Sequence, residues 1–152
     1  MGSSALKFDS LAATARRWYP NDPLADRFMA EYHRDVPIDD VEDRDLGDVV
    51  SVAAAHLELG RRRAAGQTLV KAIVPPTQTR ALGSAVLLFV TDDIPFLVDT
   101  VRMVLDRRSL GIELLVHPML LVARDGNDEL IEVVEQGVAA PPATQVEAWT
   151  QI

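Results

Sequence analysis

The residues best placed to do chemistry lie at the start of an amphipathic helix, directly after a run of apolar residues. Two aspartates there are competent N-caps, and the proline that follows suits a first helical turn. Helix N-termini also attract anions, because their first N–H groups lack intrahelical partners. Two interpretations therefore stand side by side: the aspartates cap their own helix, or the backbone holds a carboxylate-bearing effector. The candidate effector loop is Asp92, Asp93, Ile94, Pro95 and Phe96.

A second candidate is a pair of large apolar residues on the polar side of the same helix. With Leu97 at 0° on a helical wheel, Phe96 lies at about 260° and Met103 at about 240°, away from the apolar stripe. An aligned aromatic–methionine pair off the core stripe suits an interface with another domain or subunit. The alternative is that both side chains fold over their own helix or meet the N-terminal helices.

The rest of the chain offers no pattern for catalysis, cofactor binding or metal binding. It has no cysteine, and His33, His56 and His117 fall in separate elements without metal-ligand spacing. No phosphate loop, dinucleotide fingerprint or serine nucleophile elbow is present. The acidic residues at 39–45 precede a helix, where carboxylates favour the positive end of the dipole. We therefore expect no catalytic residue, no metal ligand and no cofactor site in this chain.

Composition limits the class of protein. The 152 residues carry a net charge of −8 and are 48% hydrophobic, which suits one folded domain of ordinary size. An acidic chain is a poor partner for nucleic acid or anionic membranes. No stretch approaches the ~20 apolar residues of a membrane span, and no secretory signal is visible. We expect a cytoplasmic protein, and residues 1–5 are consistent with a cloning remnant. The arginines at 61–63 and 107–108 are expected at helix C-termini, where positive charge is favourable.

Periodicity and punctuation predict the order of the elements. Apolar residues recur at helical spacing in three segments before residue 60, with Asp22 as the N-cap of the second. Apolar runs and turn signals then predict strands, an amphipathic helix and a hairpin at Asp125-Gly126. The expected helices cover residues 11–19, 23–36, 46–57 and 94–108, and the expected strands cover 68–74, 85–91, 112–123, 129–134 and 146–152.

From residue 46 onward this order is α-β-β-α-β-β. A right-handed crossover places the helix after residue 91 on one face of the sheet, and the helix at 46–57 is expected to cover the same face. We expect an α+β fold, a ferredoxin-like or ACT-like two-layer sandwich with an antiparallel sheet and helices on one face. The expected parts are an N-terminal helical extension at 1–45, the sandwich at 46–136, and at 137–152 a linker and the start of a further strand.

Several segments resemble one protein family. Residues 90–118 read VTDDIPFLVDTVRMVLDRRSLGIELLVHP, residues 41–63 read VEDRDLGDVVSVAAAHLELGRRR, and the chain finishes with EAWTQI. Together with FMAEYHRDV at 28–36, they resemble the first ACT-like domain of the large bacterial NAD-specific glutamate dehydrogenases. The resemblance implies a non-catalytic regulatory or assembly domain of an oligomeric enzyme. Its partners would be other domains of the same polypeptide, and the NAD and glutamate sites would lie downstream.

The chain departs from effector-binding ACT domains at one position. Those domains usually carry glycine in a D-x-x-G-L pattern, whereas this chain has Phe96 there and Pro95 before it. A side chain at this position hinders close approach of a ligand to the backbone. The leading hypothesis is therefore assembly. The alternatives are an amino-acid sensor that controls the parent enzyme allosterically and a free-standing small enzyme on the same scaffold.

Overall fold

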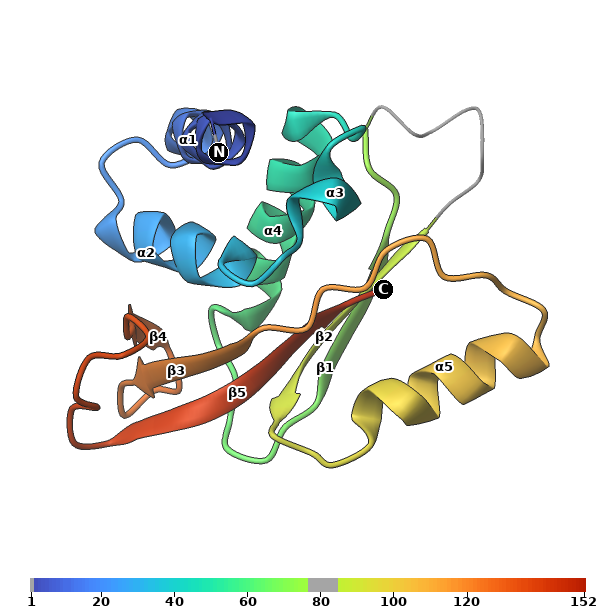
Figure 1. Ribbon diagram of the computed structural model, residues 1–152. Coiled ribbons are helices and arrows are strands. Elements are labelled where there is room, and N and C mark those ends of the chain that lie inside the picture. The colour runs from blue at the N-terminus through green and yellow to red at the C-terminus, as the bar shows by residue number, and fades with distance from the viewer. Residues whose placement is uncertain (1, 77–84) are drawn as a thin grey trace.

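The computed structural model describes residues 2–76 and 85–152, which form an α+β fold built on one antiparallel sheet (Figure 1). Met1 and residues 77–84, between the strands expected at 68–74 and 85–91, lie outside these residues. The helices are α1 (Gly2–Trp18), α2 (Pro23–His33), α3 (Ile38–Val41), α4 (Leu46–Gly60) and α5 (Leu97–Arg107). The strands are β1 (Leu69–Ile73), β2 (Val86–Asp92), β3 (Met119–Arg124), β4 (Leu130–Val133) and β5 (Thr144–Gln151).

The strand order β1-β2-β5-β3-β4 confirms the ferredoxin-like arrangement. Because β5 pairs antiparallel with both β2 and β3, those two strands run parallel to each other, and α5 connects them. This is a split β-α-β unit with one strand inserted between its parallel pair. Strand β1 borders β2 on the other side and, with α4, is supplied ahead of the usual first strand.

The last strand lies in the middle of the sheet. Trp149 of β5 pairs with Val90 of β2, and Glu147 of β5 pairs with Leu120 of β3. Since side chains two residues apart share a face, Trp149 and Glu147 point to the same side. Residues 146–152, whose place the sequence left open, therefore complete the core of the sheet.

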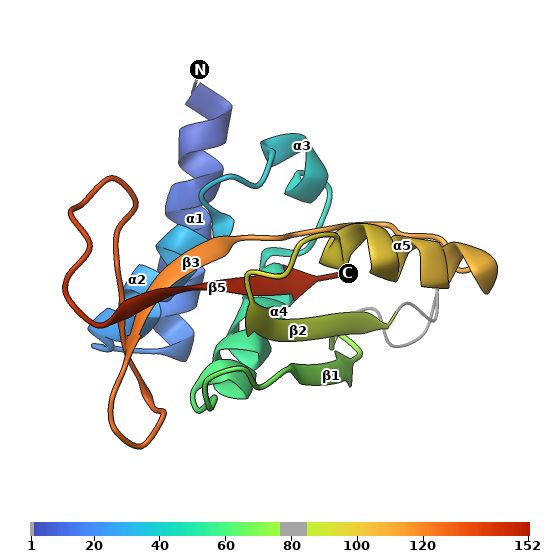
Figure 2. The same cartoon turned by 90° about the horizontal axis from the view of Figure 1, so that it is seen from below.

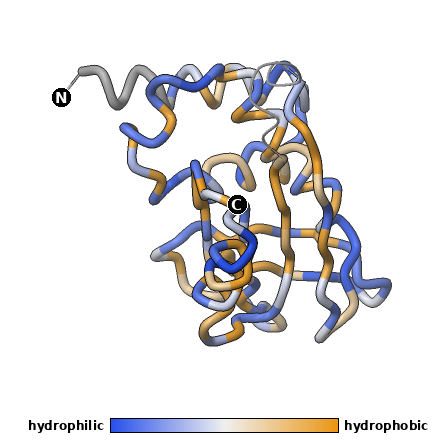
Figure 3. Tube along the Cα trace, turned by 90° about the vertical axis from the view of Figure 1, so that its right-hand side faces the viewer, coloured by the Kyte–Doolittle hydropathy of each residue, from blue (hydrophilic) through white to orange (hydrophobic). Residues whose placement is uncertain are grey.

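The hydrophobic core lies on the face of the sheet that carries Trp149. The Trp149 ring packs 5.0 Å from Phe28 and 5.2 Å from His56, between ring centroids. Gly60 passes directly over the indole, so that a Cβ at this position would collide with the ring. Figure 3 shows hydrophobic residues concentrated along the strands, where this core forms. Helix α4 packs on β1 and β2, α2 packs on β4, and α1 lies across both helices.

Local signals explain where these helices begin. The Asp22 carboxylate accepts a hydrogen bond of 3.0 Å from Ala25 N, with Pro23 in the first turn of α2. Asp45 accepts in the same way from Asp48 N, also at 3.0 Å. Asp45 therefore acts as a helix cap, and residues 38–41 before it form the short helix α3. Helix α4 ends at Gly60.

Helix α5 does not join the packed helical layer. Figures 1 and 2 show α1, α2 and α4 grouped together, with α5 apart from them near the end of β5. No residue of α5 is buried, although the helix is strongly amphipathic, and the core contains none of its side chains. Phe28 and Tyr32 of α2 already fill the face over Trp149 beside α4, which leaves α5 no place there. The helical layer is thus formed by α1, α2 and α4, and the expectation that the helix after residue 91 would share a layer with α4 is wrong.

The strand expected at 112–123 is shorter than its apolar run. Strand β3 begins at Met119, and before it Val116 forms an isolated bridge with Gln151. Pro118 stands just outside the strand, where its carbonyl accepts from Trp149 N at 3.0 Å. Proline is tolerated here because no N–H is needed from it. The hairpin at Asp125 is confirmed by the bond of Asp125 N to Glu129 O at 2.9 Å.

Candidate functional site

The loop before α5 differs from the capped helix start that the sequence predicted. The helix begins at Leu97, its N-cap residue is Phe96, and no side chain caps it. Asp92 still belongs to β2, and its carboxylate lies 2.7 Å from the Arg63 guanidinium. The prediction that Asp92 or Asp93 caps α5 is therefore wrong. An ion pair to Arg63 outweighs capping for Asp92. Three residues lie between Asp93 and Leu97, the first residue of the helix.

Phe96 adopts a backbone conformation that favours glycine. Its φ is +61° and its ψ is +14°, in the left-handed region. An L-residue pays roughly 1–2 kcal/mol there. This is the position at which the D-x-x-G-L pattern has glycine. The backbone keeps the left-handed conformation that glycine adopts easily, although Phe96 is strained in it. Its side chain is 77% exposed, and that of Met103, on the same helix, is 46% exposed.

A buried charge network lies beneath the loop. Arg63 donates to Glu147 at 3.0 Å and to Asp92 at 2.7 Å. Arg124 donates to both oxygens of Glu147, at 2.8 and 2.9 Å. The side chains of Arg63 and Glu147 are completely buried. These bonds join the segment after α4 to β2, β3 and β5, so the network fixes the end of β2 from which the loop departs.

The network corrects the sequence interpretation of Arg63. The sequence placed Arg63 among arginines that favour a helix end, whereas its side chain is inside the protein. Burial alone would raise the pKa of Glu147, but the hydrogen bonds and charge of Arg124, with help from Gln145 and Arg63, hold that pKa below its usual value. One signal in the sequence could have indicated this buried network: Glu147 is an acidic residue on the same strand face as Trp149.

Each of the three histidines contacts a hydrogen-bonding partner within the fold. His56 lies in a buried chain, with Nε2 2.9 Å from Phe89 O and Nδ1 2.8 Å from the Tyr32 hydroxyl. His33 contacts Met29 O through Nδ1 at 3.0 Å, and His117 contacts the Thr150 hydroxyl at 2.6 Å. Within residues 2–76 and 85–152, no three ligand-type side chains gather as a metal site would need. None of the helices in those ranges is long and apolar enough to cross a bilayer.

Comparison with known proteins agrees with this architecture. Residues 28–152 match the family model of the glutamate dehydrogenase ACT1 domain. The chain is 28% identical over 125 residues to an NAD-specific glutamate dehydrogenase of Pseudomonas aeruginosa, covering 81% of this chain and 8% of that protein. No solved structure matches. Because the family model covers most of the chain, this protein belongs to the ACT1-domain family of glutamate dehydrogenases.

Proposed function

We propose that this chain is a non-catalytic regulatory and assembly domain of a large NAD-dependent glutamate dehydrogenase. The parent enzyme would oxidatively deaminate L-glutamate to 2-oxoglutarate and ammonia in the cytoplasm, with NAD bound by another domain. The family membership supports this proposal, and so does the relative, of which this chain spans only 8%. Glutamate-dependent reduction of NAD by the purified chain would contradict the non-catalytic part.

The start of α5 carries the assembly proposal. Phe96 holds a strained backbone conformation and exposes 77% of its surface, which is costly for an isolated domain. Met103 adds a second exposed apolar side chain on the same helix. Strain and exposure together are explained if both side chains are buried against another domain or subunit of an oligomer.

The test places charge on this surface. Phe96→Glu with Met103→Glu should weaken association, measured by analytical ultracentrifugation of this chain and of the parent polypeptide, with circular dichroism unchanged. Val138→Glu is the matched control, because Val138 is 56% exposed and lies in a connector away from α5. If the double variant stays folded and sediments as the wild type does, the surface is not an interface.

A second candidate function is amino-acid sensing at residues 92–96. The observation that favours it is the absence of a side-chain cap on α5; Leu97 N bonds to Ile94 O, and no side chain occupies the position where a carboxylate would meet the N–H groups that follow. A thermal-shift screen over the common amino acids tests it. A ligand at 100 times its Kd stabilises the fold by roughly 2.7 kcal/mol. Binding there should be lost in Phe96→Glu, whose carboxylate occupies the anion position.

A further inference from the structure

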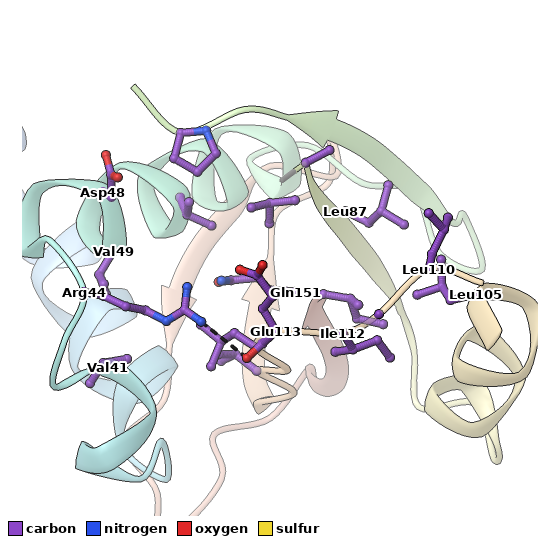
Figure 4. Close-up of a pocket in the computed structure, with 18 of the residues that line it drawn as sticks. Val41, Arg44, Asp48, Val49, Leu87, Leu105, Leu110, Ile112, Glu113 and Gln151 are labelled. Atoms are coloured by element: carbon purple, nitrogen blue, oxygen red, sulfur yellow. Dashed lines mark hydrogen bonds between the residues drawn. The ribbon is translucent and has the colours of Figure 1, made fainter. Parts of the chain in front are cut away.

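A cavity of about 390 Å³ opens between α4 and the C-terminal end of α5, at the opposite end of α5 from the Phe96 loop. Figure 4 shows it enclosed by α4, the start of β2 and the segment that follows α5. Its volume is within the range of small-molecule sites, and most of its lining is apolar. The apolar walls include Val49, Val52, Leu87, Leu105, Leu110 and Ile112.

A hydrogen-bond chain decides what Gln151 presents to this cavity. His56 Nε2 faces the carbonyl oxygen of Phe89 and must therefore carry a proton. Burial lowers the pKa of His56 to about 4, so the imidazole is neutral and Nδ1 is an acceptor. The Tyr32 hydroxyl, 2.8 Å from Nδ1, has a single proton and donates it there.

The amide of Gln151 is oriented by the same chain. Its Oε1 lies 3.0 Å from Tyr32 Oη, but that hydroxyl has no proton left to give to a second acceptor. The Gln151 amide must then donate its NH2 to Tyr32 and turn its oxygen away, since amide orientation follows from the bonding network. Gln151 is only 9% exposed and lines the cavity. A nearly buried amide oxygen thus faces the cavity.

Arg44 supplies the complementary charge. Its guanidinium donates to two backbone carbonyls, to Asp40 O at 3.0 Å and to Glu113 O at 3.3 Å. Within the described ranges it pairs with no carboxylate, and its third nitrogen contacts no acceptor. Figure 4 shows its side chain extending into the cavity. An anionic group on a ligand would balance this charge in a partly desolvated setting.

We propose that this cavity binds a small aliphatic carboxylate that carries an N–H or O–H donor beside the carboxylate. The carboxylate would meet Arg44, the donor would meet Gln151, and the aliphatic chain would lie against Leu105, Leu110 and Ile112. Asp48 and Glu113 also line the cavity. Such a ligand would link the end of α5 to α4. The site depends neither on the Phe96–Met103 surface nor on the loop at 92–96.

Four probes with the same aliphatic chain separate the polar requirements. L-leucine carries an ammonium donor, L-2-hydroxy-4-methylpentanoate a hydroxyl donor, and 4-methyl-2-oxopentanoate no donor; 3-methylbutylamine lacks the carboxylate. Calorimetry on the 152-residue chain should show binding of one or both of the first two. The oxo acid should bind at least tenfold more weakly, and the amine should not bind measurably. Equal binding of the oxo acid would overturn the role of Gln151, and binding of none of the four would overturn the site.

Variants locate the binding. Arg44→Gln should weaken binding at least tenfold, and Leu110→Trp should block it by filling the cavity from a side chain that is 52% exposed. Arg108→Gln is the matched control, because Arg108 is exposed and does not line the cavity. Circular dichroism confirms that each variant is folded. Binding that survives both cavity variants, or that Phe96→Glu abolishes, would place the ligand elsewhere and refute this site.

Discussion

Acidification from pH 7 to pH 5 should destabilise this protein through two buried histidines. Burial lowers the pKa values of His33 and His56 to about 4, from an ordinary value of 6.5. Below pH 6.5 the unfolded chain binds a proton at each imidazole, whereas the folded chain does not until the pH nears 4. Stability is therefore full above pH 6.5 and falls as the pH decreases through this window.

The size of the loss follows from the pKa values. Between pH 6.5 and pH 5 each histidine spans 1.5 pKa units, and one unit corresponds to about 1.36 kcal/mol, which gives about 2 kcal/mol per histidine. Together they remove about 4 kcal/mol, a large part of the roughly 5–15 kcal/mol that stabilises a typical domain. The carboxylates with lowered pKa values, Glu147 and Asp22, keep their contribution in this window, because it is lost only below their ordinary values near 4.

Urea unfolding at pH 7, 6 and 5, followed by circular dichroism, measures this loss. Imidazole NMR titration supplies the assignment: neither His33 nor His56 should titrate above about pH 5. His117 is the internal control, because it is more exposed and the charge of Asp93 partly offsets the lowering of its pKa by burial. A free energy of unfolding that stays constant between pH 7 and pH 5 would show that the two imidazoles are not held neutral by burial.

Three substitutions test the packing that positions the candidate sites. Glu147→Gln should destabilise the fold by about 3–5 kcal/mol in urea unfolding, because it leaves Arg63 as a buried charge with one carboxylate instead of two. The control is Glu135→Gln, at an exposed ion pair with Arg27, which should destabilise the fold by less than about 1 kcal/mol. Gly60→Ala should lower Tm and cost about 1–3 kcal/mol, because the added methyl collides with the Trp149 ring; an unchanged Tm would mean that α4 approaches β5 less closely. Phe96→Gly should change stability by less than about 1 kcal/mol, since relief of the left-handed strain offsets the entropy of glycine, yet it should weaken association in ultracentrifugation. A loss of stability larger than 2 kcal/mol would instead assign Phe96 a role in the fold.

The elements that the sequence predicted well are those whose signals are local. Asp22 with Pro23, Asp45 before α4 and the Asp125 hairpin each act within a few residues, and the structure confirms all of them. The crossover from β2 through α5 to a further strand followed from a connection rule that depends only on chirality, whereas the central place of β5 did not. The family resemblance added the ACT-like fold, which the family model confirms.

The candidate sites could not be predicted in the same way, because they depend on contacts across long separations in the chain. Arg63 and Glu147 are 84 residues apart, and neither shows in its own neighbourhood that it will be buried with the other. Asp92 looked like a cap because local preference favours it, but the ion pair to Arg63 prevails in the folded chain. The cavity arises where the end of β5 meets α4 and the segment after α5, a junction that no periodicity reveals.

The two ends of α5 together explain why a strongly amphipathic helix is left without a buried residue. At its start, Phe96 accepts strain and exposure; near its C-terminal end, Leu105 and Leu110 line a cavity instead of a packed core. If α5 served stability alone, its apolar side chains would be fully buried, because half-buried leucines contribute only part of the transfer free energy that full burial gives. Weak attachment to the core lets a contact at either end shift the helix at low cost, because few packed contacts must break. That property suits a domain whose proposed role is to transmit binding or assembly to the rest of an enzyme.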